Sequence, residues 1–287
     1  MLVFGSTGQV ASALKMTLAD QGAVFLDREA CDLASPAAVQ AALERYQPRV
    51  IINAAAYTAV DRAEEEPELA DAINAEAPRI MAEYVARASS ACLIHISTDF
   101  VFNGTRTTPY RPGDPTDPLG AYGASKLAGE LTILDAAPER SMIIRTAWVY
   151  HEEGGNFVKT MLRLMGERSE LGVVNDQRGS PTYAASIADA ITTIIQQDLF
   201  TPGIYHWTDA GDITWYEFAA AIQEEALELG LLDRAITVNP ITTDDYPTPA
   251  ERPAYSVLDC TKLTRLTGLE PVPWRENLRN MLITLSS

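Results

Sequence analysis

The feature that most constrains the fold is a regular alternation of short β-branched runs with helical patterns in the first half of the chain. The runs predict strands at Leu2–Phe4, Ala23–Leu26, Arg49–Asn53, Cys92–Ser97 and Met142–Arg145. The segments between them predict helices at Val10–Ala19, Ser35–Tyr46, Asp61 to about Asn74, Pro78–Ala88 and Ala121–Asp135. Strands that alternate with helices are typical of βαβ units. We therefore expect an α/β fold with a doubly wound parallel sheet.

The pattern becomes irregular after Tyr150. Further helices are expected at Phe157–Met165, Ala184–Gln197 and Trp215–Leu229. Gly104–Pro118 and the proline-stiffened segment Tyr246–Pro253 read as loops. We expect residues 1–150 to form a nucleotide-binding domain and residues 151–287 to form mainly a smaller substrate-binding lobe, with elements near 184–210 able to return to the first domain.

Charge and composition exclude several functional classes. With 22 Lys and Arg against 39 Asp and Glu, the net charge of −17 argues against broad binding to nucleic acids or anionic membranes. No apolar run is long enough to span a bilayer, and no signal peptide is apparent, so we expect a cytoplasmic protein. The cysteines and histidines have no metal-ligand spacing.

A glycine turn follows the first predicted strand and leads into a helix. Gly5 permits the tight turn, and Gly8 lets the backbone approach a pyrophosphate, which the N–H groups of a helix start can bind. Gln9 and Val10 begin that helix. Ala11 stands where a third glycine is common. A plain strand-to-helix turn would have the same pattern, but the strand, turn and helix context favours a dinucleotide site.

The expected continuation of this site lies after the second and third strands. Asp27 is placed to bind ribose hydroxyls, whereas Arg28 would suit a 2′-phosphate, so either NADPH or NADH remains open as the cofactor. Asp32 and Leu33 would border the adenine. Small residues follow the third strand and would let the cofactor lie against the backbone; they are Ala54, Ala55 and Ala56.

Two further patterns supply candidate catalytic groups. Tyr122 and Lys126 lie one helical turn apart, and a neighbouring ammonium favours the phenolate and brings the tyrosine pKa toward neutrality. Ser97 and Thr98 end the fourth predicted strand, where a hydroxyl can bond to and polarise a substrate carbonyl. Each pattern is common by itself, but their combination with the glycine turn in one domain is far less so.

With these motifs the sequence resembles the extended short-chain dehydrogenase/reductase family, and within it the dTDP-4-dehydrorhamnose reductases. The resemblance runs from Val3 to about Met281. It rests on the segments Asn53–Asp61, Ser97–Asp99 with Val101-Phe102, Tyr122–Glu130, Arg145–Tyr150, Asn156–Arg163, Val174–Gln177 with Pro181-Thr182, and Tyr246–Arg252. It implies a Rossmann sheet, a nicotinamide cofactor and a dTDP-linked keto-sugar substrate.

The resemblance also implies roles for individual residues. Tyr122 would protonate the sugar 4-oxygen, Lys126 would hold the nicotinamide ribose and lower the tyrosine pKa, and Thr98 would set the geometry of the carbonyl. Asp99 would touch the sugar and Trp148 would present a flat face to the thymine base. Arg252 would contact the diphosphate, although a plain surface arginine fits the sequence equally well.

One departure from the family concerns a magnesium ion that bridges dimers in some members. The carboxylates that would hold it are replaced by Ala13 and Ser186, which are poor magnesium ligands. We therefore expect no resident metal, and a monomer or a dimer without magnesium.

Other functions within the same resemblance differ by single features. A dehydratase typically has an acidic residue after the Thr-Asp pair, where this chain has Phe100, which disfavours dehydration. A reductase of another 4-keto-6-deoxy sugar remains open. A non-catalytic regulatory subunit, like a methionine adenosyltransferase partner of this fold, should lack part of the Tyr, Lys and Thr set, which this chain retains.

Overall fold

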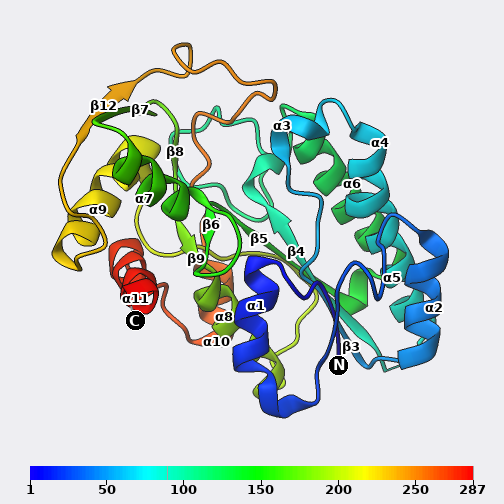
Figure 1. Cartoon of the computed structure of the whole chain (residues 1–287). Coiled ribbons are helices and arrows are strands. Elements are labelled where there is room, and N and C mark those ends of the chain that lie inside the picture. Colours follow the sequence, from blue (N-terminus) through cyan, green and yellow to red (C-terminus); the bar gives the residue numbers. More distant parts are fainter. Residues whose placement is uncertain (89, 287) are drawn as a thin grey trace.

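A six-stranded parallel sheet forms the centre of the first lobe in the computed structural model, which describes residues 1–88 and 90–286 (Figure 1). Its strands are β1 (Leu2–Phe4), β2 (Val24–Leu26), β3 (Val50–Asn53), β4 (Cys92–Thr98), β5 (Ser141–Thr146) and β10 (Gly203–His206). Their order is β10-β5-β4-β3-β1-β2, and all neighbours are parallel. The predicted doubly wound α/β class is confirmed. The order reverses between β1 and β3, which is where such sheets bind ligands.

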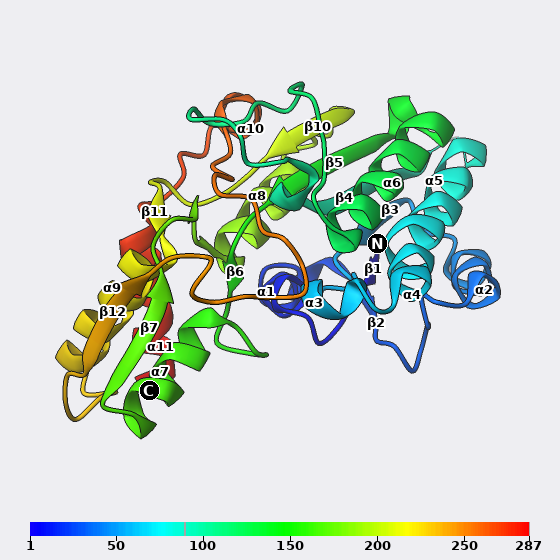
Figure 2. The same cartoon turned by 90° about the horizontal axis from the view of Figure 1, so that it is seen from above.

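Helices cover both faces of this sheet (Figures 1 and 2). One apolar core packs α2 (Pro36–Tyr46), α5 (Ala77–Arg87) and the end of α6 (Ala121–Ala136) against the sheet. A second core packs α1 (Gln9–Thr17) and α8 (Ala184–Gln196) against the opposite face. The β-branched strands are buried on both sides, as expected for a parallel sheet.

The segment predicted as one helix from Asp61 to about Asn74 is in fact broken. It consists of α3 (Val60–Ala63), α4 (Pro67–Asp71) and the five-residue π segment η2 (Ala72–Glu76), which continues into α5. Pro67 has no N–H and its ring disfavours a helical residue before it, so Glu66 is non-helical, with φ −125° and ψ 46°. Pro67 thus begins a helix rather than continuing one.

The second lobe has its own core, built from α7 (Phe157–Glu167), α9 (Trp215–Glu228) and α11 (Trp274–Ser286). These helices pack with the parallel pair β7 (Glu170–Val174) and β12 (Thr237–Ile241). Two short ladders complete the lobe: β6 (Val149–Tyr150) with β9 (Thr182–Tyr183), and β8 (Arg178–Gly179) with β11 (Ile213–Thr214).

The boundary between the lobes is crossed several times by the chain. After the first part of the second lobe, α8 packs on α1 and β10 joins the edge of the central sheet. The helix α10 (Thr261–Thr267) also contributes to the core of the first lobe. Short 3₁₀ turns occur at η1 (Ala19–Gln21), η3 (Asp99–Val101) and η4 (Pro138–Arg140).

Both segments predicted as loops are loops, and the first is hydrogen-bonded to the chain that follows the second. The backbone of Tyr110 accepts from Asp259 and donates to Val257, each at 2.8 Å. None of the helices in the described ranges is both long and apolar enough to cross a bilayer.

Candidate active site

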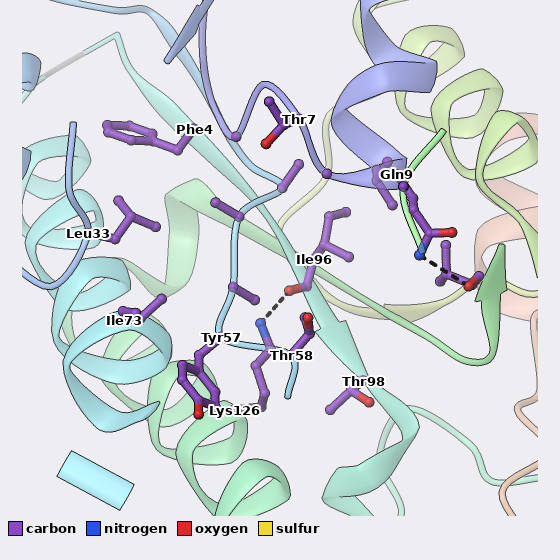
Figure 3. A pocket seen from close by; sticks show the side chains of 18 of the residues that line it. Phe4, Thr7, Gln9, Leu33, Tyr57, Thr58, Ile73, Ile96, Thr98 and Lys126 are labelled. Carbon is purple, nitrogen blue, oxygen red and sulfur yellow. Dashed lines mark hydrogen bonds between the residues drawn. The ribbon is translucent and has the colours of Figure 1, made fainter. Parts of the chain in front are cut away.

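A cleft of about 780 Å³ opens at the carboxyl ends of β1, β3, β4 and β5 and extends to the second lobe (Figure 3). All but one of the predicted site residues line it. They are Gly5, Gly8, Gln9, Val10, Asp27, Arg28, Asp32, Leu33, Ala54, Ala55, Ala56, Thr98, Asp99, Tyr122, Lys126 and Trp148. The exception is Arg252.

The glycine turn has the geometry that a dinucleotide requires. Gly5 has φ +105°, in the region that side chains avoid, and a Cβ added there would lie 3.3 Å from the Ala54 backbone. Gly8 caps α1 without a side-chain hydrogen bond, so the first N–H groups of the helix are left for a ligand. The turn therefore fits a pyrophosphate at the start of α1.

The far end of the cleft carries charges of both signs. The Asp27 carboxylate accepts from the Ala30 N–H at 2.8 Å, and Arg28 faces Asp32 with N and O atoms 3.9 Å apart. The Arg28 side chain is 79% exposed, so it is free to turn toward a ligand. This arrangement accommodates a ribose with or without a 2′-phosphate.

The second lobe contributes a part of the cleft that the sequence analysis missed. Gln9 donates to the Val149 carbonyl at 3.3 Å, and Asn156 donates to the Gln9 side chain at 3.1 Å. Gly154 and Gly155 line the cleft beside them. The adjacent glycines followed by the helix-capping Asn156 were a possible signal for a ligand loop.

Tyr122 and Lys126 both project from α6 into the cleft and are almost completely buried. Burial raises the pKa of Tyr122 to about 12, although a hydrogen bond with Thr98 acts in the opposite direction. The ring also makes an edge contact with Phe100, at 5.5 Å between centroids. The phenol is consequently protonated at neutral pH and able to donate.

Lys126 is directed toward β4. Its Nζ donates to the Ile96 carbonyl at 2.7 Å and lies 3.3 Å from Nε2 of His95 (Figure 3). Burial lowers the pKa of Lys126 to about 8, with Glu130 acting to raise it. The sequence analysis expected Lys126 to lower the pKa of Tyr122. In this structure the pKa of Tyr122 is raised instead, because burial is the largest influence and the lysine is engaged by the strand.

Thr98 ends β4 and Asp99 follows it, and both line the cleft. Thr98 Oγ1 donates to Asp99 Oδ1 at 3.0 Å and accepts from the Phe100 N–H at 3.2 Å. Burial raises the pKa of Asp99 to about 6, while hydrogen bonds from Ser256 and Thr98 oppose this shift. Ser97 does not share this role, because its hydroxyl bonds to Glu130 beneath the cleft.

Trp148 lines the cleft, but Trp215 and Gly179 both pack against its indole. It stacks on Trp215, with centroids 3.4 Å apart and an interplanar angle of 8°. A Cβ at Gly179 would lie 2.6 Å from the indole, so that position has no room for a side chain. Trp148 also has φ +47°, which is unusual for a bulky residue and indicates that packing fixes its orientation. Sequence reasoning did not find Trp215.

Arg252 lies outside the cleft lining. Its guanidinium donates to Asp61 Oδ2 at 2.8 Å and to the Ala250 carbonyl at 2.8 Å. The expected diphosphate contact is therefore not supported by this geometry. Arg252 instead joins the proline loop to α3.

The two positions considered for magnesium have other surroundings. Ala13 is buried in the core between α1 and α8, and the Ser186 hydroxyl lies 2.6 Å from Asp209 Oδ1. Within residues 1–88 and 90–286, no three His, Cys, Asp or Glu side chains are grouped so as to hold a metal ion.

Comparison with known proteins identifies the family of the chain. The family model described as "RmlD substrate binding domain" matches residues 1–287. The chain belongs to this family. The dTDP-4-dehydrorhamnose reductase of Aggregatibacter actinomycetemcomitans is 42% identical over 98% of this chain and 97% of its own.

Solved structures of family members superpose along the whole chain. The dTDP-4-dehydrorhamnose reductase of Clostridium acetobutylicum has a TM-score of 0.91 and 36% identity, and covers 100% of this chain and 99% of its own. The Bacillus anthracis reductase, solved in complex with NADP, has a TM-score of 0.90 and 36% identity, with coverage of 99% and 98%.

Proposed function

We propose that this family member is a dTDP-4-dehydrorhamnose reductase, which reduces the 4-keto group of dTDP-4-dehydro-L-rhamnose to give dTDP-L-rhamnose with NADPH or NADH. The observation that carries the proposal is the meeting of the glycine turn, Thr98, Tyr122 and Lys126 in one cleft. The full-length identity to reductases of this name and the NADP complex of a family member support it.

The cofactor, when bound, supplies the hydride that reduces C4. Tyr122 donates the proton to the 4-oxygen; its raised pKa supports this, because a phenol that stays protonated at neutral pH is ready to act as an acid. Thr98 is proposed to turn its hydroxyl, which donates to Asp99 in this structure, toward the substrate carbonyl. Lys126 is proposed to leave the Ile96 carbonyl and bind the ribose hydroxyls of the cofactor.

Asp99 and Trp148 are proposed to bind the sugar nucleotide. Asp99 lies in the cleft beside Tyr122, where it can accept from a sugar hydroxyl. The indole of Trp148 is held rigidly by Trp215 and Gly179, and the part that lines the cleft can contact the base.

We further propose that the protein acts in the cytoplasm as a monomer or as a dimer that magnesium does not bridge. The absence of a magnesium bridge is supported by the residues at positions 13 and 186, since neither Ala13 nor Ser186, which contacts Asp209, has a carboxylate of its own. A reductase of another nucleotide-linked 4-keto-6-deoxy sugar remains the alternative, because the contacts above recognise the nucleotide and the carbonyl rather than the ring stereochemistry.

The test is the oxidation of NADPH and NADH, followed at the nicotinamide absorbance, with dTDP-4-dehydro-L-rhamnose made in situ and with or without magnesium. Substrate-dependent oxidation with dTDP-L-rhamnose as product is expected, without any need for magnesium. If folded protein binds the cofactor but does not oxidise it, the substrate assignment is wrong, and other keto-sugars or a regulatory role take its place.

A further inference from the structure

Three buried polar side chains form a row beneath the catalytic cleft, on three different elements. Asn53 ends β3, His95 lies in β4 and Lys126 projects from α6; each is at most 2% exposed. Asn53 Nδ2 lies 3.1 Å from His95 Nδ1, and His95 Nε2 lies 3.3 Å from Lys126 Nζ. His95 is therefore contacted on both ring nitrogens, although the sequence motifs do not include it.

The hydrogen bonds of this row determine where the imidazole proton lies. The Ala55 N–H donates to Asn53 Oδ1 at 3.3 Å, which leaves the amide NH₂ of Asn53 to face His95. An NH₂ group donates, so Nδ1 must accept. Burial holds the pKa of His95 well below its usual range, so the ring is neutral and its single N–H is on Nε2.

The tautomer in turn determines the state of Lys126. An Nε2–H donor requires an acceptor, and a lysine accepts only through the lone pair of its uncharged amine. The amine can still donate one of its own N–H groups to the Ile96 carbonyl, at 2.7 Å. Each hydrogen-bond donor in the row then faces an acceptor.

We infer that His95 is a positioning residue that stabilises the uncharged amine of Lys126 in the cofactor-free protein, through an Nε2–H tautomer fixed by Asn53. The consequence for catalysis rests on the proposed function. Above about pH 8, where the amine is uncharged, Lys126 takes up a proton from solvent as it turns to the ribose, so cofactor binding and proton uptake are linked.

The charged groups around Lys126 are consistent with this arrangement. Glu130 lies on the same helix, but its carboxylate is paired with Arg145 of β5 at 2.6 Å, which limits its effect on the lysine. Asp99, which follows β4, has its own pKa raised to about 6. Tyr122, on the side of the cleft, is neutral, and so is Asn74 of η2, which bonds to Ser125.

The direct test is the ¹⁵N spectrum of the cofactor-free protein labelled at its three histidines, which reports the protonation of each ring nitrogen. His206 is an internal reference of the opposite tautomer, because its Nδ1 faces the Tyr110 carbonyl at 3.0 Å and must donate. The His95→Gln variant assigns the His95 signals. We expect His95 to be neutral with its proton on Nε2 at pH 9, where Lys126 is uncharged; a proton on Nδ1, or on both nitrogens, at this pH would overturn the inference.

A variant of the same shape, Asn53→Asp, should reverse the tautomer of His95. In Asn53→Asp a carboxylate faces Nδ1, so the proton should move to Nδ1 and Nε2 should accept from a charged Lys126. Calorimetric binding of NADPH in buffers of different ionisation heat then measures proton uptake. Uptake should appear in the wild type as the pH passes about 8, and should shift upward by roughly one pH unit or more in the variant.

The His95 tautomer and the proton uptake on NADPH binding test the inference independently of the proposed function. The tautomer is measured without cofactor or sugar, so a failure to reduce the keto-sugar leaves it intact. Cofactor binding without proton uptake on either side of pH 8 would contradict the role given to Lys126, whichever sugar the enzyme reduces.

Discussion

At the scale of single residues, burial determines the charge of the active site. It raises the pKa of Tyr122 to about 12 and that of Asp99 to about 6, and it lowers that of Lys126 to about 8. Each shift favours the uncharged form of its group. At pH 7 Tyr122 is uncharged, whereas Asp99 and Lys126 are mostly ionised but lie within about one pH unit of losing their charge.

The Tyr122→Phe variant removes only the transferable proton. We expect kcat to fall by roughly 10²- to 10⁴-fold, as for the loss of a general acid, with little change in the Kd for NADPH. Steady-state kinetics together with cofactor titration provide the measurement. Turnover close to that of the wild type would show that another group supplies the proton.

The raised pKa of Asp99 predicts that the free energy of unfolding depends on pH. Its folded pKa is raised from 3.8 to about 6, so the wild type loses stability as the pH rises through this window, where the unfolded chain ionises first. Asp99→Asn should therefore stabilise the protein by up to about 3 kcal/mol at pH 7 and by much less near pH 4, while sugar binding weakens. Urea denaturation at the two pH values measures the change in unfolding free energy that the substitution causes. An equal change at both pH values would show that the raised pKa of Asp99 is not its cause.

Residues with a backbone or chemical signature could be identified from the sequence, whereas their buried partners could not. The glycine turn and Tyr122–Lys126 have fixed local spacing. Asn53 and His95 meet only because they are register partners in adjacent strands, which depends on the strand order. The stacking of Trp148 on Trp215 likewise depends on how α9 packs.

At the scale of elements, α6 is held against its neighbours by glycines. A Cβ at Gly123 would lie 2.3 Å from the Phe100 carbonyl, and one at Gly129 would lie 2.1 Å from the Asn74 carbonyl. This contact places the π segment directly against α6, where Asn74 bonds to Ser125 and to the Tyr57 backbone. The position of the catalytic helix thus depends on two missing side chains.

Gly129→Ala should consequently destabilise the protein by about 1–3 kcal/mol, since backbone must move to admit the methyl group. Gly166→Ala in α7 is the matched control. No atom lies within 4 Å of its added Cβ, so it should be neutral or stabilise by up to about 1 kcal/mol. Chemical denaturation of both variants decides the matter: equal effects would exclude close packing as the cause.

Elements with strong local signals were predicted well. Ser35, the first residue of a predicted helix, caps α2 by accepting from the Ala38 N–H. The break at Pro67 was missed, although a proline inside a helical pattern signals one. The π segment, in contrast, has no distinct sequence pattern, since its register is set by packing against α6 rather than by its own residues.

At the scale of the whole molecule, the two lobes are joined by polar contacts around the cleft. Gln9 connects the glycine turn to Val149 and Asn156, while Arg252 and the Ala250 N–H both bond to Asp61. Figure 2 shows the loop that carries Arg252 passing beside α3. The sequence predicted two lobes and this loop. It could not predict their contacts, because these join residues about 140 to 190 positions apart.

The Asp61–Arg252 pair predicts that the proline loop is fastened to the first lobe next to the cleft, since Val60 lines the cleft and Asp61 follows it. Arg252→Ala should free the loop, increase amide exchange in residues 246–253 and raise the KM for the sugar nucleotide several-fold, because a mobile loop must be ordered on binding. The KM for NADPH should change little.

Arg62→Ala is the control. Arg62 pairs on the surface with Glu66, four residues away, and its loss should alter neither the amide exchange of the loop nor the KM for the sugar nucleotide. An unchanged exchange pattern in Arg252→Ala would mean that the loop is held by its prolines alone, and that the ion pair contributes nothing to the closure of the cleft.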